Sequence, residues 1–210
     1  MYKRQTLADL KGKTVGYPAG TSGEMILRLA LAKAGLTMKD IKAEPLDPAT
    51  LVSALTSGKI DAAGFNYPSL AAVKAKYPDM IELAKDSDFT SKMRFPTAFV
   101  SQESLPTKDP ALVKKVLTVL KEANTYRYEH KTSAIALTAT MLKLSKAAVT
   151  SDASYDQLVS TPSLEAAAKD GSTDKWFDTY GAYFVKTGIL TSPGSASDYF
   201  TSSLYESAGK

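Results

Sequence analysis

The sequence predicts an α/β fold in which a doubly wound parallel sheet is followed by a mostly helical part. Two observations lead to this prediction. In the first third of the 210 residues, short apolar segments typical of strands alternate with amphipathic segments typical of helices. After about residue 93, helical periodicity prevails. Strands and helices that alternate this closely favour a parallel sheet covered by helices on both faces.

Local signals at segment ends place the elements of the first part. Asp47 suits a helix N-cap, Pro48 the first helical position, and Gly58 the helix end. Gly35 ends an earlier helix in the same way. We therefore expect strands at 14–17, 41–46, 60–65 and near 80–84, and helices at 22–34, at 48–57, and from Pro68 to just before Pro78.

The pattern changes around Ser91–Pro96, which indicates a boundary near Met93–Phe95. One last strand is expected at 97–101, and Asp109-Pro110 starts a long amphipathic helix. The Ser/Gly-rich tail after Thr191 is expected to pack loosely. Further helices are expected near 133–142, 155–160 and 173–187.

Composition and charge exclude several kinds of function. Apolar residues make up 44% and charged residues 23% of the chain, and the net charge is +4. No basic stripe or nucleic-acid module is present, so nucleic acid is not an expected partner. The absence of cysteine excludes disulfides, thiolate catalysis and cysteine-bound metals. The scattered lysines are expected on outer helix faces: Lys11, Lys13, Lys33, Lys39, Lys42, Lys114, Lys115 and Lys121.

The segment Gly20-Thr-Ser-Gly23 joins the first strand to the first helix. A strand–turn–helix unit of this kind directs free backbone N–H groups, here with the hydroxyls of Thr21 and Ser22, toward a small anion or carboxylate. It is not a nucleophile elbow, because a glycine follows Ser22 directly and His130 is the only histidine. A Walker loop is excluded because the G-K-[ST] sequence is missing.

The same turn also predicts a capping box. In that arrangement Thr21 bonds the N–H of Glu24, and Glu24 bonds the N–H of Thr21. A cap leaves other N–H groups available, so a cap alone and a cap with a ligand contact both remain open. The negative charge of Glu24 favours a ligand with a polar or cationic part over a small, highly charged anion.

A second polar step, Phe65-Asn-Tyr-Pro68, follows the expected strand at 60–65. Asn66 supplies a donor and an acceptor, and Tyr67 supplies a flat apolar face with a hydroxyl. Taken alone, the step also fits a simple turn before a helix. Because the ends of parallel strands share one sheet edge, the two steps together favour a ligand cleft.

With these segments in view, the chain resembles the sulfonate/taurine/nitrate-type substrate-binding proteins of ABC transporters, a broad family that includes binders of thiamine precursors. The resemblance spans nearly the whole chain from Thr6. The matching segments are Leu7-Ala-Asp-Leu-Lys-Gly-Lys-Thr-Val-Gly16, Gly20-Thr-Ser, Lys33-Ala-Gly-Leu36, Leu51-Val-Ser-Ala-Leu-Thr-Ser-Gly-Lys-Ile-Asp-Ala62, Tyr67-Pro68, Phe99-Val-Ser, Asp109-Pro-Ala-Leu-Val, the helix at Trp176, and Gly188-Ile-Leu190.

The resemblance implies a type II periplasmic-binding fold, in which two α/β lobes close on a ligand. Residues 1–12 would be a non-native or lead-in segment, and 13–93 a complete α/β lobe, lobe 2. Residues 94–210 would be the C-terminal, mostly helical part of lobe 1. The family's first βα units have no counterpart here, so we expect an N-terminally truncated protein.

The resemblance also implies a non-catalytic solute-binding component of an ABC importer. Its ligand would be a small organic anion or zwitterion such as a sulfonate, or a small heterocycle, and no cofactor or metal is expected. Partners would be the solute and the permease. The location would be periplasmic or extracytoplasmic, with membrane contact only through the permease or a missing N-terminal lipid anchor. The implied ligand-binding residues are Thr21, Ser22 and Gly23 for the polar head, Asn66 and Tyr67 for the opposite wall, Tyr17 at the strand end and Arg94 at the hinge.

Two alternative functions remain open at this point. A pyrimidine-synthase relative with the same fold would be an enzyme, but that branch depends on a cysteine-rich motif and an active histidine. The absence of cysteine weighs against it. A ligand-sensing domain of a larger regulator is the other alternative, although this chain contains no helix-turn-helix or kinase segment.

Overall fold

The computed structural model describes residues 6–65, 70, 73–74 and 76–209. The chain divides into two compact units, Met1–Phe95 (unit 1) and Pro96–Lys210 (unit 2). Each unit is one continuous stretch of sequence. The assignment of the two units to the lobes of a two-lobe fold stays a prediction.

Unit 1 is built around a small parallel sheet with strand order β2-β1-β3. Thr14 pairs with Lys42 on one side of β1, and Val15 pairs with Ala62 on the other. The predicted alternation of strands and helices in a parallel sheet is therefore confirmed. The elements are β1 (Thr14–Tyr17), α1 (Ser22–Lys33), β2 (Lys42–Pro45), α2 (Pro48–Thr56) and β3 (Ala62–Ala63), with short 3-10 helices at Leu7–Leu10, Met38–Asp40 and Asp86–Phe89.

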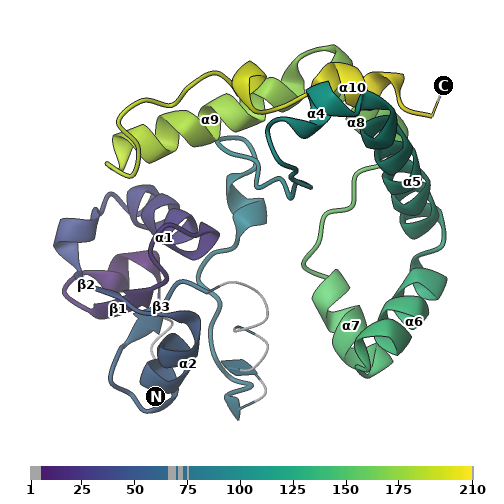
Figure 1. The fold of residues 1–210 in the computed structure, drawn as a ribbon. Coiled ribbons are helices and arrows are strands. Elements are labelled where there is room, and N and C mark those ends of the chain that lie inside the picture. Colours follow the sequence, from purple (N-terminus) through teal and green to yellow (C-terminus); the bar gives the residue numbers. More distant parts are fainter. Residues whose placement is uncertain (1–5, 66–69, 71–72, 75, 210) are drawn as a thin grey trace. The chain divides into compact units, whose positions relative to one another are not determined.

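The core of unit 1 lies on both faces of the sheet. Val15 is buried in a cluster with residues of α1, and the next residue, Gly16, faces α2. A Cβ at Gly16 would lie 2.5 Å from Cδ1 of Leu51 and 2.7 Å from Cδ1 of Ile60, so only glycine fits there. Helices α1 and α2 thus cover opposite faces of the sheet (Figure 1). The two buried clusters are Leu10, Val15, Leu27, Leu31 and Ile41, and Leu51, Ala54 and Ile60.

Two strand predictions in unit 1 need correction. The strand expected at 60–65 is formed only by Ala62–Ala63. Residues 80–84 form no strand, since this segment finds no partner in the described sheet. Of the ten residues of the helix expected from Pro68, five lie outside the described residues, and the described residues 70, 73, 74 and 76 are helical.

The described residues of unit 2 contain helices and no strand. Helix α5 contacts α4, α6, α8 and α10, while α7 packs against α6 and α9 against α8. Figure 1 shows α5 continuing through a bend into α6, and His130 lies between the two helices. The helices are α4 (Leu105–Lys108), α5 (Pro110–Glu129), α6 (Lys131–Leu142), α7 (Lys146–Ala153), α8 (Thr161–Lys169), α9 (Ser172–Lys186) and α10 (Ser202–Ser207).

Two predictions in unit 2 are wrong. Residues 97–101 form no strand. The helix expected at 155–160 is absent, because α7 ends before it and Ser160 is the N-cap of α8 after it. The tail after Thr191 is exposed at 191–195 and 197–199, as expected, but Ala196 and Ala208 are buried and α10 contacts α5 and α8.

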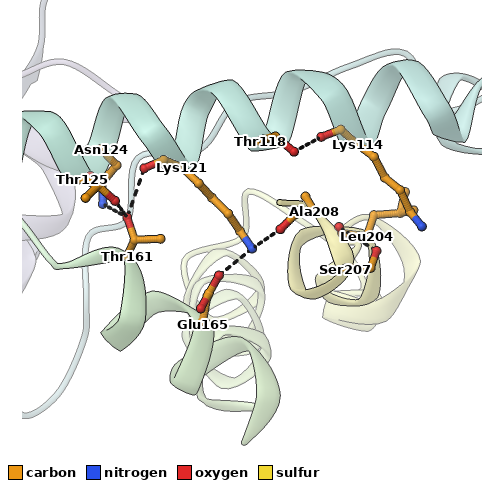
Figure 2. A network of polar contacts seen from close by, with 10 residues as sticks. All are labelled: Lys114, Thr118, Lys121, Asn124, Thr125, Thr161, Glu165, Leu204, Ser207 and Ala208. Atoms are coloured by element: carbon orange, nitrogen blue, oxygen red, sulfur yellow. Dashed lines mark hydrogen bonds and ion pairs between the residues drawn. The ribbon is translucent and has the colours of Figure 1, made fainter. Parts of the chain in front are cut away.

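Lys121 in α5 is buried, not exposed as its place among the scattered lysines suggested. Its ammonium donates to Oε1 of Glu165 at 2.7 Å and to the carbonyl oxygen of Ala208 at 2.9 Å (Figure 2). It also lies 4.5 Å from the centre of the Tyr205 ring. Burial, and then the charge of Glu165, raise the pKa of the Tyr205 phenol. Lys121 therefore joins α5, α8 and the C-terminal residues.

A second set of polar contacts holds the start of α8 against α5. The Thr161 hydroxyl donates to the carbonyl oxygen of Lys121 at 3.2 Å and accepts from Nδ2 of Asn124 at 3.1 Å. It also shares a hydrogen bond of 2.8 Å with the hydroxyl of Thr125. These bonds satisfy the Thr161 hydroxyl where its side chain is buried.

Candidate functional site

The turn between β1 and α1 is fixed by its own hydrogen bonds. Gly20 adopts a left-handed conformation with φ of 72°, which favours glycine. Thr21 is the N-cap of α1, and its hydroxyl accepts from the N–H of Gly23 at 3.2 Å. The same hydroxyl donates to the carbonyl oxygen of Pro18 at 2.6 Å. Thr21 is half-buried, while Ser22, the first residue of α1, is exposed.

Glu24 closes this turn in a different way from the predicted capping box. Its carboxylate accepts from the N–H of Gly20 at 2.8 Å, one residue before the expected Thr21. The other oxygen accepts from Nε of Arg28 at 2.8 Å. Glu24 is only 5% exposed, so the pair places a buried negative charge, with its own counter-charge, in the first turn of α1. Sequence reasoning missed Arg28, although its spacing of four residues from Glu24 is a usable signal.

Gly23 and Gly64 bring the two predicted site segments together. A Cβ on Gly64 would lie 2.5 Å from the carbonyl oxygen of Gly23, and a Cβ on Gly23 would lie 3.0 Å from that of Gly64. The start of α1 therefore lies directly against the residues that follow β3. Asn66 and Tyr67, the predicted opposite wall of the ligand cleft, lie outside the described residues. The structure therefore describes this side of the cleft only as far as Phe65.

The remaining predicted residues lie at different places in unit 1. Tyr17 ends β1, and its side chain packs against the buried cluster around Val15 and Leu31. Arg94 is exposed near the end of unit 1. The structure thus brings Thr21, Ser22 and Gly23 beside the end of β3, and the role of Tyr17 stays a prediction.

The described residues contain no cluster of three or more His, Cys, Asp or Glu side chains that could hold a metal ion. In the β1–α1 turn, the Thr21 hydroxyl and the N–H groups of Gly20 and Gly23 bond within the turn. The turn therefore presents an exposed serine, Ser22, at a helix start, beside a balanced ion pair. This chemistry suits recognition of a polar group. Over the same part of the chain, no helix combines the length and the hydropathy of a membrane span.

Solved structures share this fold. The crystal structure of the periplasmic aliphatic sulphonate binding protein SsuA from Escherichia coli matches with a TM-score of 0.71 and 22% identity, over 95% of this chain and 62% of that chain. The alkanesulfonate-binding protein SsuA from Xanthomonas axonopodis pv. citri, bound to MOPS, matches with a TM-score of 0.68 and 21% identity, over 93% of this chain and 65% of that chain. The chain therefore has the fold of the periplasmic binding proteins, over part of their length, as predicted.

Sequence comparison gives the family. Residues 3–134, more than half of the chain, match the family described as NMT1/THI5 like, and the chain belongs to this family. A Brucella abortus protein named only as a binding protein is 38% identical over 201 residues, which are 96% of this chain and 63% of that protein. A protein of Escherichia coli strain K12, named for binding aliphatic sulfonates, is 29% identical over 140 residues, 67% of this chain and 43% of that protein.

The chain spans 63% of the length of the Brucella relative that it matches. The predicted resemblance to the sulfonate-type substrate-binding proteins is confirmed, and the similarity supports a solute-binding role.

Proposed function

We propose that this chain is part of the solute-binding component of an ABC importer and that it binds a small organic anion or zwitterion without catalysis. Two of the similar structures are described as sulfonate-binding proteins, which supports a sulfonate-like ligand. Nitrate, taurine and small heterocycles belong to the same range of small polar solutes. No cofactor takes part in this proposal.

One observation carries the proposal: the first turn of α1, with Thr21, Ser22 and Gly23, lies against the residues that follow β3. In open parallel sheets, ligands bind at the carboxyl ends of the strands, and a helix start attracts negative charge. The polar head of the solute would bind at this turn. Asn66 and Tyr67 would form the opposite wall, and Arg94 would contribute from the hinge.

Glu24 narrows the range of ligands. Its buried carboxylate already occupies the N–H of Gly20, and Arg28 balances its charge. The turn therefore adds no net positive charge that would offset the second charge of a dianion such as phosphate. A monoanion or a zwitterion fits better, which favours sulfonates and aminosulfonates over more highly charged solutes.

The proposed partners are the solute and the transporter permease, and the proposed location is periplasmic or extracytoplasmic. The similarity to the Escherichia coli structure supports this location, since that protein is described as periplasmic. Contact with a membrane would be made through the permease or through a lipid anchor that lies outside this sequence.

The free energy of binding that one helix start can supply predicts that the 210-residue chain binds its solute only weakly. Micromolar affinity corresponds to about −8 kcal/mol. One helix N-terminus contributes roughly 0.3–1 kcal/mol to anion binding, and about 2 kcal/mol when partly buried. The rest of the binding free energy must come from further contacts between protein and solute. This chain covers only 62–65% of the length of the sulfonate-binding proteins. A truncated protein, as we propose here, would lack part of the cleft.

A titration followed by two-dimensional NMR tests the site directly, because it detects millimolar binding. An aliphatic sulfonate is added to the 15N-labelled chain, and an alkylammonium ion of the same length serves as the control. We expect saturable shifts of the amides at positions 20–24 and 64–65 with the sulfonate and none with the cation. No saturable shift at these amides, or an equal response to the cation, would contradict the proposed site.

A further inference from the structure

The net charge of +4 lies entirely on unit 1. Unit 1 contains 14 lysine and arginine residues and 10 aspartate and glutamate residues, whereas unit 2 contains 12 of each kind. A difference in charge between two parts of a chain points to a polyanionic or membrane partner for the basic part. A surface that attracts such a partner is therefore expected on unit 1.

Five lysines of unit 1 lie at one edge of its sheet, the edge where the parallel strands begin. The backbone N–H of Lys42 donates to the carbonyl oxygen of Lys13 at 2.8 Å, and that of Asp61 donates to the carbonyl oxygen of Thr14 at 2.8 Å. The segments that lead into β1, β2 and β3 thus lie side by side. We call the exposed lysines of these segments the basic edge: Lys11, Lys13, Lys39, Lys42 and Lys59.

The basic edge corrects one expectation from the sequence. The lysines were expected on outer helix faces, but none of these five lies on an α-helix. They lie at the first residue of β2, in the 3-10 helix Met38–Asp40 and in the connecting segments. The fold therefore gathers them on one surface instead of scattering them over several faces.

The carboxylates in the same segments do not cancel this charge. Each of the three accepts from a backbone N–H: Asp9 from Thr6 at 2.7 Å, Asp40 from Thr37 at 2.8 Å and Asp61 from Thr14 at 2.8 Å. The hydrogen bonds from Thr37, and more weakly the charge of Lys11, lower the pKa of Asp40. In the described part of the chain, none of the five lysines forms an ion pair. With five lysines and three aspartates, the basic edge keeps a net charge of +2.

The opposite edge of the sheet has a different charge. Glu44 lies toward the end of β2, and Asp47 caps the helix that follows it. Glu24 lies in the first turn of α1, where Arg28 balances it. Unit 1 is therefore polarised along its strands, and its positive side faces away from the proposed solute site.

We propose that the basic edge binds the surface of a bilayer that contains anionic phospholipids. All five cations are lysines, which are point charges on flexible stems and suit a fluid surface whose charges have no fixed positions. A protein partner is less suitable, because protein interfaces centre on aromatic and arginine side chains. The segments 9–13, 37–42 and 57–61 contain neither.

This direct contact goes beyond the membrane contact that the family resemblance implies, which is made through the permease or a lipid anchor. Each lysine near an anionic bilayer favours binding about fivefold. The attraction is screened beyond about 8 Å at physiological ionic strength, so it would orient a chain that is already near the membrane. The proposal does not depend on the identity of the solute, because no residue of the β1–α1 turn takes part in it.

Co-sedimentation of the 210-residue chain with lipid vesicles tests the proposal. The vesicles contain phosphatidylcholine alone or with about one third phosphatidylglycerol, at ionic strengths of about 0.05 M and 0.5 M. In the edge variant, Lys11, Lys13 and Lys42 are changed to glutamine, and a second variant carries arginine at the same positions. The matched control loses the same charge at exposed positions of unit 2: Lys115→Gln, Lys131→Gln and Lys146→Gln.

We expect the natural chain and the arginine variant to bind the anionic vesicles and to be released at the higher ionic strength. The edge variant should bind at least tenfold less, and the control should stay within about twofold of the natural chain. Retained binding of the arginine variant would show that the loss comes from charge and not from misfolding.

Three results would overturn the proposal. Equal binding to neutral and anionic vesicles would mean that exposed apolar side chains such as Phe99 and Val100 make the contact. An equal loss in the edge variant and the control would mean that only the net charge matters. Tighter binding to poly-glutamate than to vesicles of equal charge concentration would identify an acidic protein segment as the partner. The proposed solute site is tested separately by the NMR titration.

Discussion

Gly23 and Gly64 meet backbone to backbone at the place where α1 starts and β3 has just ended. A Cβ on Gly64 would lie 2.5 Å from the carbonyl oxygen of Gly23, closer than real Cβ atoms approach. The two segments that carry the proposed solute site are therefore held together by the absence of side chains at both positions. Because of this contact, even a substitution of glycine by alanine is expected to disturb the proposed site.

Gly64→Ala is expected to destabilise unit 1 by about 1–3 kcal/mol, because the added methyl group meets backbone and cannot be avoided by a rotamer change. Gly23→Ala is the matched comparison. Its Cβ would approach the carbonyl oxygen of Gly64 only to 3.0 Å, and alanine favours the helix by up to about 1 kcal/mol. Urea unfolding followed by circular dichroism should rank Gly64→Ala as clearly more destabilised. An equal free energy of unfolding for both variants would contradict the close contact between Gly64 and the carbonyl oxygen of Gly23.

Glu24→Gln is expected to tighten binding of a monoanionic sulfonate by about two- to five-fold, because it removes one negative charge next to the turn. The amide oxygen can still accept from the N–H of Gly20, so the turn should persist, at a cost of about 1 kcal/mol for the weaker bond to Arg28. The NMR titration measures this effect, with Glu44→Gln on the exposed edge strand β2 as the control. Equal tightening in both variants would mean that Glu24 does not face the ligand.

Asp47 makes the stability of unit 1 depend on pH. Its carboxylate caps α2 and accepts from the Thr50 hydroxyl and from the N–H groups of Thr50 and Ala49. These hydrogen bonds, that of the Thr50 hydroxyl first, lower the pKa of Asp47 below its ordinary value. A lowered pKa in the folded state adds stability above the unfolded pKa of about 3.9, and this stability is lost as the pH falls through the folded value.

Asp47→Asn keeps a capping oxygen but cannot titrate, so its unfolding midpoint should change less with acid than that of the natural chain. We expect the difference between the two proteins to be largest at pH 7 and to shrink below pH 4. Thermal unfolding between pH 3 and pH 7 measures this difference. Asp40 and Asp170 also have lowered pKa values, and they cancel because both proteins contain them. A difference that is constant with pH would contradict the role of the Asp47 charge.

Lys121→Ala is expected to cost about 1–3 kcal/mol of stability, since it removes the donor to Glu165 and Ala208 and leaves the Ala208 carbonyl oxygen without its partner. Lys121→Met should cost less, because it keeps the apolar stem packed against its neighbours. Hydrogen exchange should show faster opening of α10 in both variants. Lys115→Ala, at an exposed position on a different face of the same helix, should change stability by less than about 0.5 kcal/mol. A large effect of that control would contradict the specific role of Lys121.

Elements with signals in their own residues were predicted well, and elements that depend on distant partners were not. The cap at Asp47 and the Asp109-Pro110 start specified α2 and α5, and both helices are present. The strands expected at 80–84 and 97–101 have suitable residues, but a strand needs hydrogen-bonded neighbours, and the described sheet offers none. The serine caps of α7 and α8 were visible in the sequence and were missed, which explains the misplaced helix at 155–160.

The candidate site was predicted in part. The turn at Thr21 and Ser22 is where the sequence placed it, since strand, glycine turn and cap are all local features. The contact between Gly23 and Gly64 spans 41 residues of sequence, so no local pattern specifies it. Burial of Lys121 likewise depends on Glu165 and Ala208, which come to α5 only through tertiary packing.

The two compact units follow one another along the chain, with a single crossing between Phe95 and Pro96. During synthesis, unit 1 therefore leaves the ribosome complete before any of unit 2 has emerged, and its sheet can form without waiting for later sequence. The same linear order gives a genetic junction at which either unit can be exchanged for that of a relative without cutting a strand or a helix.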